Sequence, residues 1–238
     1  MHKQLKIYWR LYEEEYSNEY LLKNFTNLMD IYHPEKDGII ADIGCGQSEY
    51  LIDFYKNSNH NLYAIDEESI QINALKRRIE KLNSNGKITY INKRFPNKEF
   101  INLKFSGVII SDVLHFLDLK GAKSFITEVE KNLYTGSILL ITVHSWKHSK
   151  FGDHTYFKHY FKEEDFGYLL PQEKYKYLYA DVKSISPNNK KIEFIKEWMK
   201  NVAHEHNIYD PQEITRIQNE YLNEMHSEEK MTIVVKKT

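Results

Sequence analysis

A short glycine-containing segment, residues 42–48 with the sequence DIGCGQS, carries the clearest chemical signal in this chain of 238 residues. Glycines let the backbone pass close to a ligand, and the helix that is expected to follow offers free N–H groups at its first turn. About twenty residues on, Asp66 ends the next apolar run, where a carboxylate can accept hydrogen bonds from two ribose hydroxyls. Together these features predict a site for a nucleoside-bearing ligand. The alternative is an ordinary tight turn between a strand and a helix.

The spacing distinguishes between nucleoside-bearing ligands. A dinucleotide fingerprint reads G-x-G-x-x-G, and Glu49 stands at its third glycine, where a carboxylate would oppose a pyrophosphate. Asp42 precedes the first glycine by two residues, where it can hold a cationic amino group. S-adenosylmethionine, which has an ammonium group, a ribose and no phosphate, fits better, so a nicotinamide-dependent oxidoreductase is the least favoured class. A P-loop is excluded because no Gly-Lys-Ser/Thr follows.

Alternating strands and helices must position these residues. Continuous apolar runs separated by helical patterns are typical of a parallel sheet that is covered on both faces. In the second helix we expect Ile70, Ala74, Leu75 and Ile79 to face inward. The predicted strands cover 39–43, 61–65, 87–92, 107–110 and 137–144, and the predicted helices cover 50–57, 69–82 and 119–133.

The two ends of the chain add helices and two further strands. We predict helices over 4–31, 190–206 and 210–226, and strands over 175–184 and 231–236. The chain is therefore expected to be a single domain, 1–238. Its predicted parts are an N-terminal helical cap (1–37), a cofactor-binding core (38–186), a helical insertion or lid (187–229) and a final strand (230–238).

Four segments in this order resemble the successive motifs of class I S-adenosylmethionine-dependent methyltransferases: residues 39–46, 64–66, 108–117 and 134–141. The resemblance implies an α/β fold with a Rossmann-like, seven-stranded, mostly parallel sheet, helices on both faces and an antiparallel last strand. It also implies S-adenosylmethionine as the cofactor, contacted by Asp42, Gly44, Gly46 and Asp66.

The predicted cofactor site extends beyond those four residues. A third glycine that the family usually has is replaced by Ser48, which is small. The family's acid after the third strand is missing, so adenine is expected to pack on Phe95 or to meet backbone groups. Tyr12 and Tyr16 belong to an aromatic stripe that either packs in the core or lies over the cofactor. The remaining predicted contacts are Cys45, Glu67 and Ser111.

Methyl transfer from a sulfonium requires alignment of donor and acceptor and, for a protonated acceptor, removal of a proton. His115 follows the fourth predicted strand at the sheet edge where substrates bind, so it is one candidate base. The alternative is that it packs beside the cofactor. Asp112 is the second candidate, and its alternative role is to cap the next helix.

We predict no metal site. Cys45 is the only cysteine, which excludes an intrachain disulfide and a cysteine zinc cluster and fits a reducing cytoplasm. His144, His148, His154 and His159 cluster after the fifth strand. A metal site there is the less favoured alternative to a substrate-side loop or an aromatic packing segment, because no tight ligand set accompanies them.

The charge balance and the hydropathy of the chain limit the classes of partner that we expect it to bind. The 33 Lys and Arg residues balance 34 Asp and Glu residues, which argues against binding nucleic acid by bulk charge. No apolar stretch approaches the roughly 18 residues that span a bilayer, and no signal-type segment is present, so we expect a cytoplasmic protein. The expected acceptor is a small molecule. RNA or protein methylation and a non-catalytic S-adenosylmethionine-binding module stay as alternatives, and the acceptor atom (O or N) and oligomeric state stay open.

Overall fold

The computed structural model describes Ile7, Asn27 and residues 38–82, 86–100, 102–147, 157–185, 189–224 and 228–238. Apart from Ile7 and Asn27, the predicted helix over 4–31, including Tyr12 and Tyr16, lies outside the described residues. His148 and His154 also lie outside them. No helix in the described ranges is long and apolar enough to cross a bilayer.

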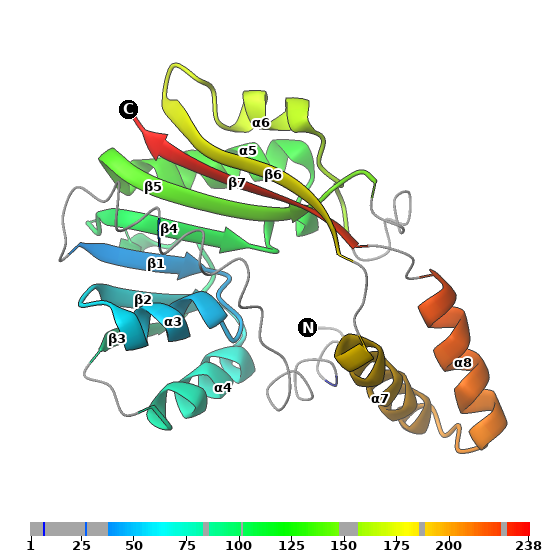
Figure 1. Cartoon of the computed structure of the whole chain (residues 1–238). Coiled ribbons are helices and arrows are strands. Elements are labelled where there is room, and N and C mark those ends of the chain that lie inside the picture. The colour runs from blue at the N-terminus through cyan, green and yellow to red at the C-terminus, as the bar shows by residue number, and fades with distance from the viewer. Residues whose placement is uncertain are drawn as a thin grey trace.

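Seven strands of the described chain form one sheet in the order β3-β2-β1-β4-β5-β7-β6 (Figure 1). Strands β1 to β5 are parallel, and β7 runs antiparallel to both β5 and β6. The predicted seven-stranded sheet with an antiparallel last strand is confirmed. The strands are β1 (Ile39–Ile43), β2 (Asn61–Asp66), β3 (Lys87–Asn92), β4 (Phe105–Ser111), β5 (Leu133–His144), β6 (Tyr175–Ile185) and β7 (Glu228–Lys237).

Helices cover both faces of this sheet, as predicted. One short helix, α6, was not predicted, because seven residues are too few for a helical period to emerge. Its signal is the acidic run 163–165, which suits the positive end of a helix dipole. The helices are α3 (Glu49–Asn57), α4 (Ser69–Glu80), α5 (Leu119–Lys131), α6 (Glu163–Leu169), α7 (Asn189–Glu205) and α8 (Pro211–Glu224), with 3-10 turns η1 (Lys98–Phe100) and η2 (Leu114–Phe116).

The central strands divide the core into two layers. In β4, Val108 and Ile110 pack in the layer that contains α5 and α6, and Ile109 packs in the layer that contains α3 and α4. This alternation follows from the two-residue period of a strand. The inward orientation expected for Ile70 is wrong, because its side chain is 45% exposed. The buried stripe of α4 instead includes Gln71, whose place in the site is described below.

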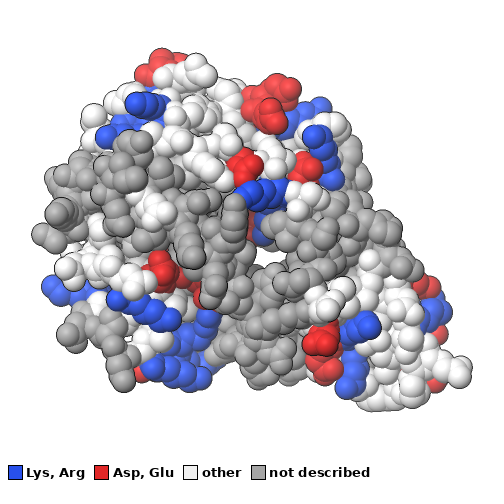
Figure 2. Space-filling model, in the orientation of Figure 1, with Lys and Arg blue, Asp and Glu red and all other residues white. Residues whose placement is uncertain are grey.

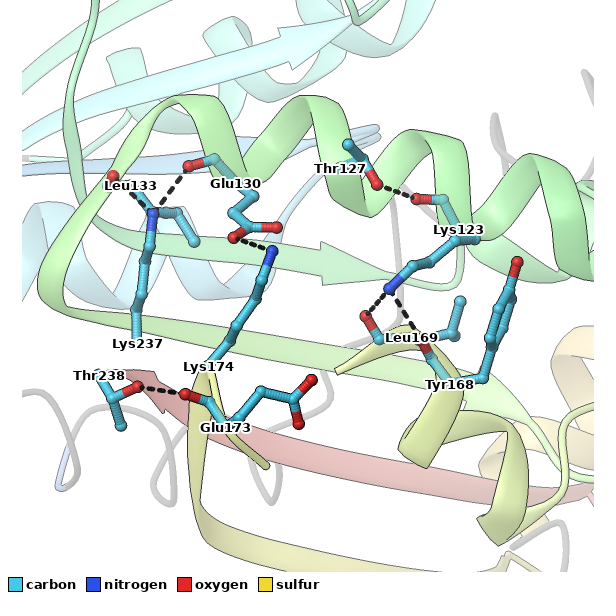
Figure 3. A network of polar contacts seen from close by, with 10 residues as sticks. All are labelled: Lys123, Thr127, Glu130, Leu133, Tyr168, Leu169, Glu173, Lys174, Lys237 and Thr238. Carbon is cyan, nitrogen blue, oxygen red and sulfur yellow. Dashed lines mark hydrogen bonds and ion pairs between the residues drawn. The ribbon is translucent and has the colours of Figure 1, made fainter. Parts of the chain in front are cut away.

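Lysine side chains fasten the antiparallel strands and α6 to α5 (Figure 3). Lys237 donates from its amine to the carbonyls of Glu130 and Leu133 at 3.1 Å, and Lys174 pairs with the Glu130 carboxylate at 2.9 Å. Lys123 donates to the carbonyl of Tyr168 at 2.8 Å, at the end of α6, where a cation suits the helix dipole. The antiparallel edge is thus tied to the parallel core.

The pair α7 and α8 lies side by side and away from the sheet (Figure 1). Phe194, Ile195 and Trp198 of α7 form a separate apolar cluster with partly buried residues of α8, and Ile7 joins this cluster at 7% exposure. Trp198 meets Tyr221 edge-on at 5.4 Å between ring centroids. Among the described residues, the predicted apolar faces of the two helices are therefore buried against each other and against Ile7.

The helical pair enters and leaves the sheet at one point, since Ile185 of β6 pairs with Glu228 of β7. We expect that a short turn replacing 186–227 closes this hairpin and leaves the sheet folded. Circular dichroism and thermal unfolding of the shortened protein check this. Loss of cooperative unfolding would show that the pair is required for folding of the sheet.

Candidate active site

The glycine-containing turn joins β1 to α3 and is tied to the end of β2. Gly44 and Gly46 have φ values of +72° and +51°, which favour glycine. A Cβ on Gly44 would also lie 2.4 Å from the Val113 side chain. The N–H groups of Gly44 and Cys45 donate to the carbonyl of Ile65 at 2.8 and 3.0 Å. The turn therefore lies close against the end of β2, as a ligand-binding loop requires.

Asp66 lies at that same edge and helps to hold the turn. Its Oδ2 accepts a hydrogen bond from the N–H of Gly46, and its Oδ1 accepts one from the N–H of Glu68, both at 2.8 Å. Burial raises the pKa of Asp66 in spite of these two bonds. Each carboxylate oxygen accepts two hydrogen bonds, so the side chain retains the capacity to bind two ligand hydroxyls.

Asp42 is the most deeply buried carboxylate of the site, at 2% exposure. Its Oδ2 accepts a hydrogen bond from the Ser48 hydroxyl at 2.5 Å, and the Ser48 oxygen accepts from the N–H of Leu51, which caps α3. Its Oδ1 is buried without a hydrogen-bond partner among the described residues. Burial raises the pKa of Asp42 to about 7, against the bond from Ser48 and together with the nearby Asp66. Among the described residues, no cationic side chain contributes to the pKa shift of this carboxylate.

These residues line one cavity of about 630 Å³, a size that suits a small ligand or cofactor. The cavity brings together ten of the thirteen predicted site residues: Asp42, Gly44, Cys45, Gly46, Ser48, Asp66, Glu67, Phe95, Ser111 and Asp112. His115 is not among the lining residues, and Tyr12 and Tyr16 lie outside the described residues. The cavity also includes residues that the sequence did not single out, among them Gln71, Lys93, Arg94, Phe125 and Lys158.

Gln71 is the clearest of these omissions. It is 4% exposed, it lines the cavity, and its Oε1 has no hydrogen-bond partner in the described part of the chain. The signal in the sequence is an amide in the first turn of α4, directly after the loop that carries Asp66.

Glu49 stands where a dinucleotide fingerprint has its third glycine, and an arginine neutralises its negative charge. Its carboxylate pairs with the guanidinium of Arg78 from α4, and the same guanidinium donates to the carbonyl of Gln47 at 2.8 Å. Both side chains are at most 19% exposed, so this ion pair is shielded from solvent. The pair links α3 and the glycine turn to α4.

Phe95 closes the side of the cavity beyond β3. It is 7% exposed and packs against Phe100 and Phe125, each at 5.3 Å between ring centroids. The ring is therefore fixed by its neighbours and offers a preformed apolar wall.

The two predicted catalytic residues follow β4. Asp112 has φ +57°, its N–H donates to the carbonyl of Thr142 at 3.0 Å, and its Oδ2 accepts from Lys230 at 2.7 Å. Burial acts to raise its pKa, but Lys230 and the neighbouring imidazoles outweigh burial and lower the pKa of Asp112 to about 2. The alternative role as a helix cap is wrong, since Asp118 caps α5.

His115 lies behind Asp112 and is 2% exposed. Its ring centroid lies 4.4 Å from that of His144 and 4.5 Å from that of Phe157. Nitrogen atoms of the two imidazoles and a carboxylate oxygen of Asp112 all lie within 4.8 Å of one another. His115 therefore packs among aromatic rings and also belongs to a polar group with Asp112.

Asp42 generates a prediction about stability. The folded protein keeps a proton on Asp42 that the unfolded chain loses near pH 4, so the contribution of this residue to the free energy of unfolding falls as the pH rises from about 4 to about 7. We expect Asp42→Asn to stabilise the ligand-free protein on the order of 2–4 kcal/mol at pH 8 and to have little effect at pH 4. Urea unfolding at both pH values checks this, and an equal effect at both would contradict it.

Comparison with known proteins identifies one domain within the chain. Residues 40–136 match the model of a methyltransferase domain. A comparison with curated proteins finds no match.

Three similar solved structures share the fold. An S-adenosylmethionine-dependent methyltransferase from Thiobacillus denitrificans, in complex with S-adenosyl-L-homocysteine, has a TM-score of 0.69 at 13% identity, over 100% of this chain and 99% of that one. The cyclopropane synthase MmaA2 from Mycobacterium tuberculosis has a TM-score of 0.67 at 12% identity, over 97% of this chain and 94% of that one. Coclaurine N-methyltransferase, bound to N-methylheliamine and S-adenosylhomocysteine, has a TM-score of 0.61 at 10% identity, over 91% of this chain and 72% of that one.

The motif order, the seven-stranded sheet with its antiparallel β7 and the matching domain model agree with one another. Residues 40–136 therefore match a methyltransferase domain, and the chain has the fold of S-adenosylmethionine-dependent methyltransferases.

Proposed function

We propose that this protein transfers the methyl group of S-adenosylmethionine to a small-molecule acceptor. One observation carries the proposal: the Oδ1 atom of Asp42 is buried in the cavity wall without a hydrogen-bond partner among the described residues. A carboxylate in this state is stabilised by a cation. The ammonium group of the cofactor's amino acid end would supply that cation.

The other residues of the cavity fit the rest of the cofactor. The close backbone approach at Gly44 and Gly46 suits the chain between the amino acid and the ribose. Asp66 retains lone pairs for the two ribose hydroxyls. The fixed ring of Phe95 suits the adenine, since a flat ring favours stacking. The cofactor supplies a methyl group on a sulfonium, and the protein must align the acceptor with it.

The acceptor side of the cavity favours a small molecule. The cavity is lined there by three apolar side chains, those of Val113, Leu117 and Phe116, and by the exposed cation Lys158. The side chain of Phe116 is 44% exposed. Basic and acidic side chains are intermixed on the described part of the face in Figure 2, so this face shows no single-sign field for a nucleic acid. The coclaurine N-methyltransferase named above holds a small molecule, N-methylheliamine.

Acceptor activation is assigned to the group formed by Asp112, His115 and His144. With a pKa of about 2, Asp112 is a weak base at neutral pH. The group can act in two ways, by accepting a proton at an imidazole or by holding a cation. The insertion over 187–229 is proposed to select the acceptor, because an insertion varies on a shared scaffold.

The cofactor proposal predicts selective stabilisation by the product. We expect S-adenosylhomocysteine to raise the melting temperature and NADH to leave it unchanged, because a ligand that binds only the folded state stabilises it. Stabilisation by NADH alone would overturn the proposal. A thermal shift assay measures both.

Asp66 gives a second prediction. We expect Asp66→Ala to weaken S-adenosylhomocysteine binding by on the order of 2–4 kcal/mol, through the lost charge-assisted bonds. Asp53→Ala removes a carboxylate of α3 that accepts a bond from Asn57, and serves as the matched control. Calorimetry measures the affinity of both variants for S-adenosylhomocysteine. Equal affinities would show that another residue holds the ribose.

The acceptor class is tested with S-adenosylmethionine that carries a labelled methyl group. We expect the label to enter the low-molecular-mass fraction of a cell extract. Label in RNA or protein would replace the small-molecule acceptor with a macromolecular one. Binding of the cofactor product without transfer to any fraction would favour a non-catalytic module.

A further inference from the structure

We propose that Asp112, His115 and His144 bind one divalent transition-metal ion beside the methyl-transfer cavity. The three donors come from the end of β4, from η2 and from the end of β5, and their ligand atoms lie within 4.8 Å of one another. Two imidazoles and one carboxylate on one side of an ion are a known ligand set for such metals and leave further positions open.

The carboxylate is held ready for an ion. The N–H of Asp112 is fixed by the carbonyl of Thr142, and Lys230 holds Oδ2 at 2.7 Å. The Oδ1 atom is buried and has no hydrogen-bond partner in the described ranges. Lys230 therefore orients the side chain and leaves one oxygen for a ligand bond, much as outer partners orient metal ligands elsewhere.

The backbones of the two histidines are also fixed. The carbonyl of His115 accepts from the N–H of Lys158 at 2.8 Å, and the carbonyl of His144 accepts from the N–H of Phe161 at 2.9 Å. His144 is paired with Lys230 across β5 and β7. All three ligands thus belong to parts of the chain whose backbone is hydrogen-bonded, which keeps the donors near one another.

The donor set decides the kind of ion. Metal–ligand distances near 2.0–2.2 Å place donors about 3–3.5 Å apart, so binding would draw the three side chains slightly together. Imidazole suits zinc, ferrous iron and cobalt, whereas magnesium prefers oxygen ligands. Because Lys230 already neutralises Asp112, the attraction for a hard cation is weak, and the imidazole nitrogens must supply the affinity.

The location gives the ion a role, and this step rests on the proposed function. Asp112 lines the cavity, so an ion on Oδ1 would reach an acceptor oxygen beside the methyl group. It would make an acceptor hydroxyl more acidic. The hydroxyl proton leaves to water, the oxygen forms a bond to the methyl carbon, and the electrons of the broken C–S bond stay on sulfur. The acceptor class would then be hydroxyl compounds.

Metal binding is tested on the whole metal-free protein with Co²⁺ and Zn²⁺, followed by cobalt absorption and by calorimetry, with Mg²⁺ as the comparison. We expect one Co²⁺ per chain, and affinity roughly tenfold or more weaker in Asp112→Asn and His144→Phe. Asn tolerates the positive φ at position 112. His159→Phe is the matched control, since His159 pairs with Asp165 outside the cluster.

S-adenosylhomocysteine binding is measured on the same samples and separates the two proposals. If it binds but Co²⁺ does not, or if all three variants bind Co²⁺ like the wild type, the metal site is wrong and the proposed function stands. If His159→Phe loses affinity as His144→Phe does, the ion lies elsewhere and the assignment is also wrong. If S-adenosylhomocysteine fails to bind, the proposed function fails whatever the metal result.

Discussion

The burial of the Asp42 carboxylate is the constraint on which the site depends. Desolvation raises its pKa to about 7, and a single hydroxyl, that of Ser48, compensates part of the loss of water. The same hydroxyl oxygen caps α3. The start of α3, the turn at Gly44 and the buried charge therefore depend on one another. The charged form of the Asp42 carboxylate is unfavourable in this buried position, and a cation beside it would stabilise it. Groups with such perturbed pKa values are common at functional sites.

The edge at which we propose that the acceptor binds depends on a long-range contact of a different kind. Lys230 reaches Asp112 although 118 positions separate them in the chain. The contact arises because β7 turns back antiparallel beside β5, which brings His144 opposite Lys230. An added parallel strand would run the other way and could not present its first residues at this edge. The antiparallel β7 thus brings a cation, Lys230, to Asp112.

The cofactor side could be predicted from the sequence because it is local. Asp42 and Ser48 lie in one turn after an apolar strand, and Asp66 ends the next strand, so spacing alone places them at one edge. The order of strands needed the family resemblance, since periodicity does not reveal which strands pair. Lys230 could not be found, because only the pairing of β7 with β5 brings it to Asp112.

The wrong orientation predicted for Ile70 of α4 has a related physical cause. Ile70 was placed inward by its hydrophobicity, but the stripe of α4 that faces the sheet contains Ile72 and Leu75, and the polar Gln71 is buried beside it at the cavity. A binding site requires polar groups where a hydrophobic pattern predicts apolar ones. The sequence favours a substrate-side loop or an aromatic packing segment for the histidines around His144, and His144 does pack on Phe157, with 4.8 Å between ring centroids. Its polar partner, Asp112, comes from another strand.

The helices α7 and α8 lie away from the sheet and form an apolar cluster of their own. The hairpin of β6 and β7 is already closed by the pairing of Ile185 with Glu228, so the sheet does not need the helices to set its register. The helices in turn bury their apolar faces in a cluster of their own with Ile7. Among the described residues, the apolar cluster of the helical pair is separate from the two core layers of the sheet. Substitutions in the pair are therefore expected to leave the geometry of Asp42, Asp66 and the glycine turn unchanged, because β1, β2 and α3 hold those residues.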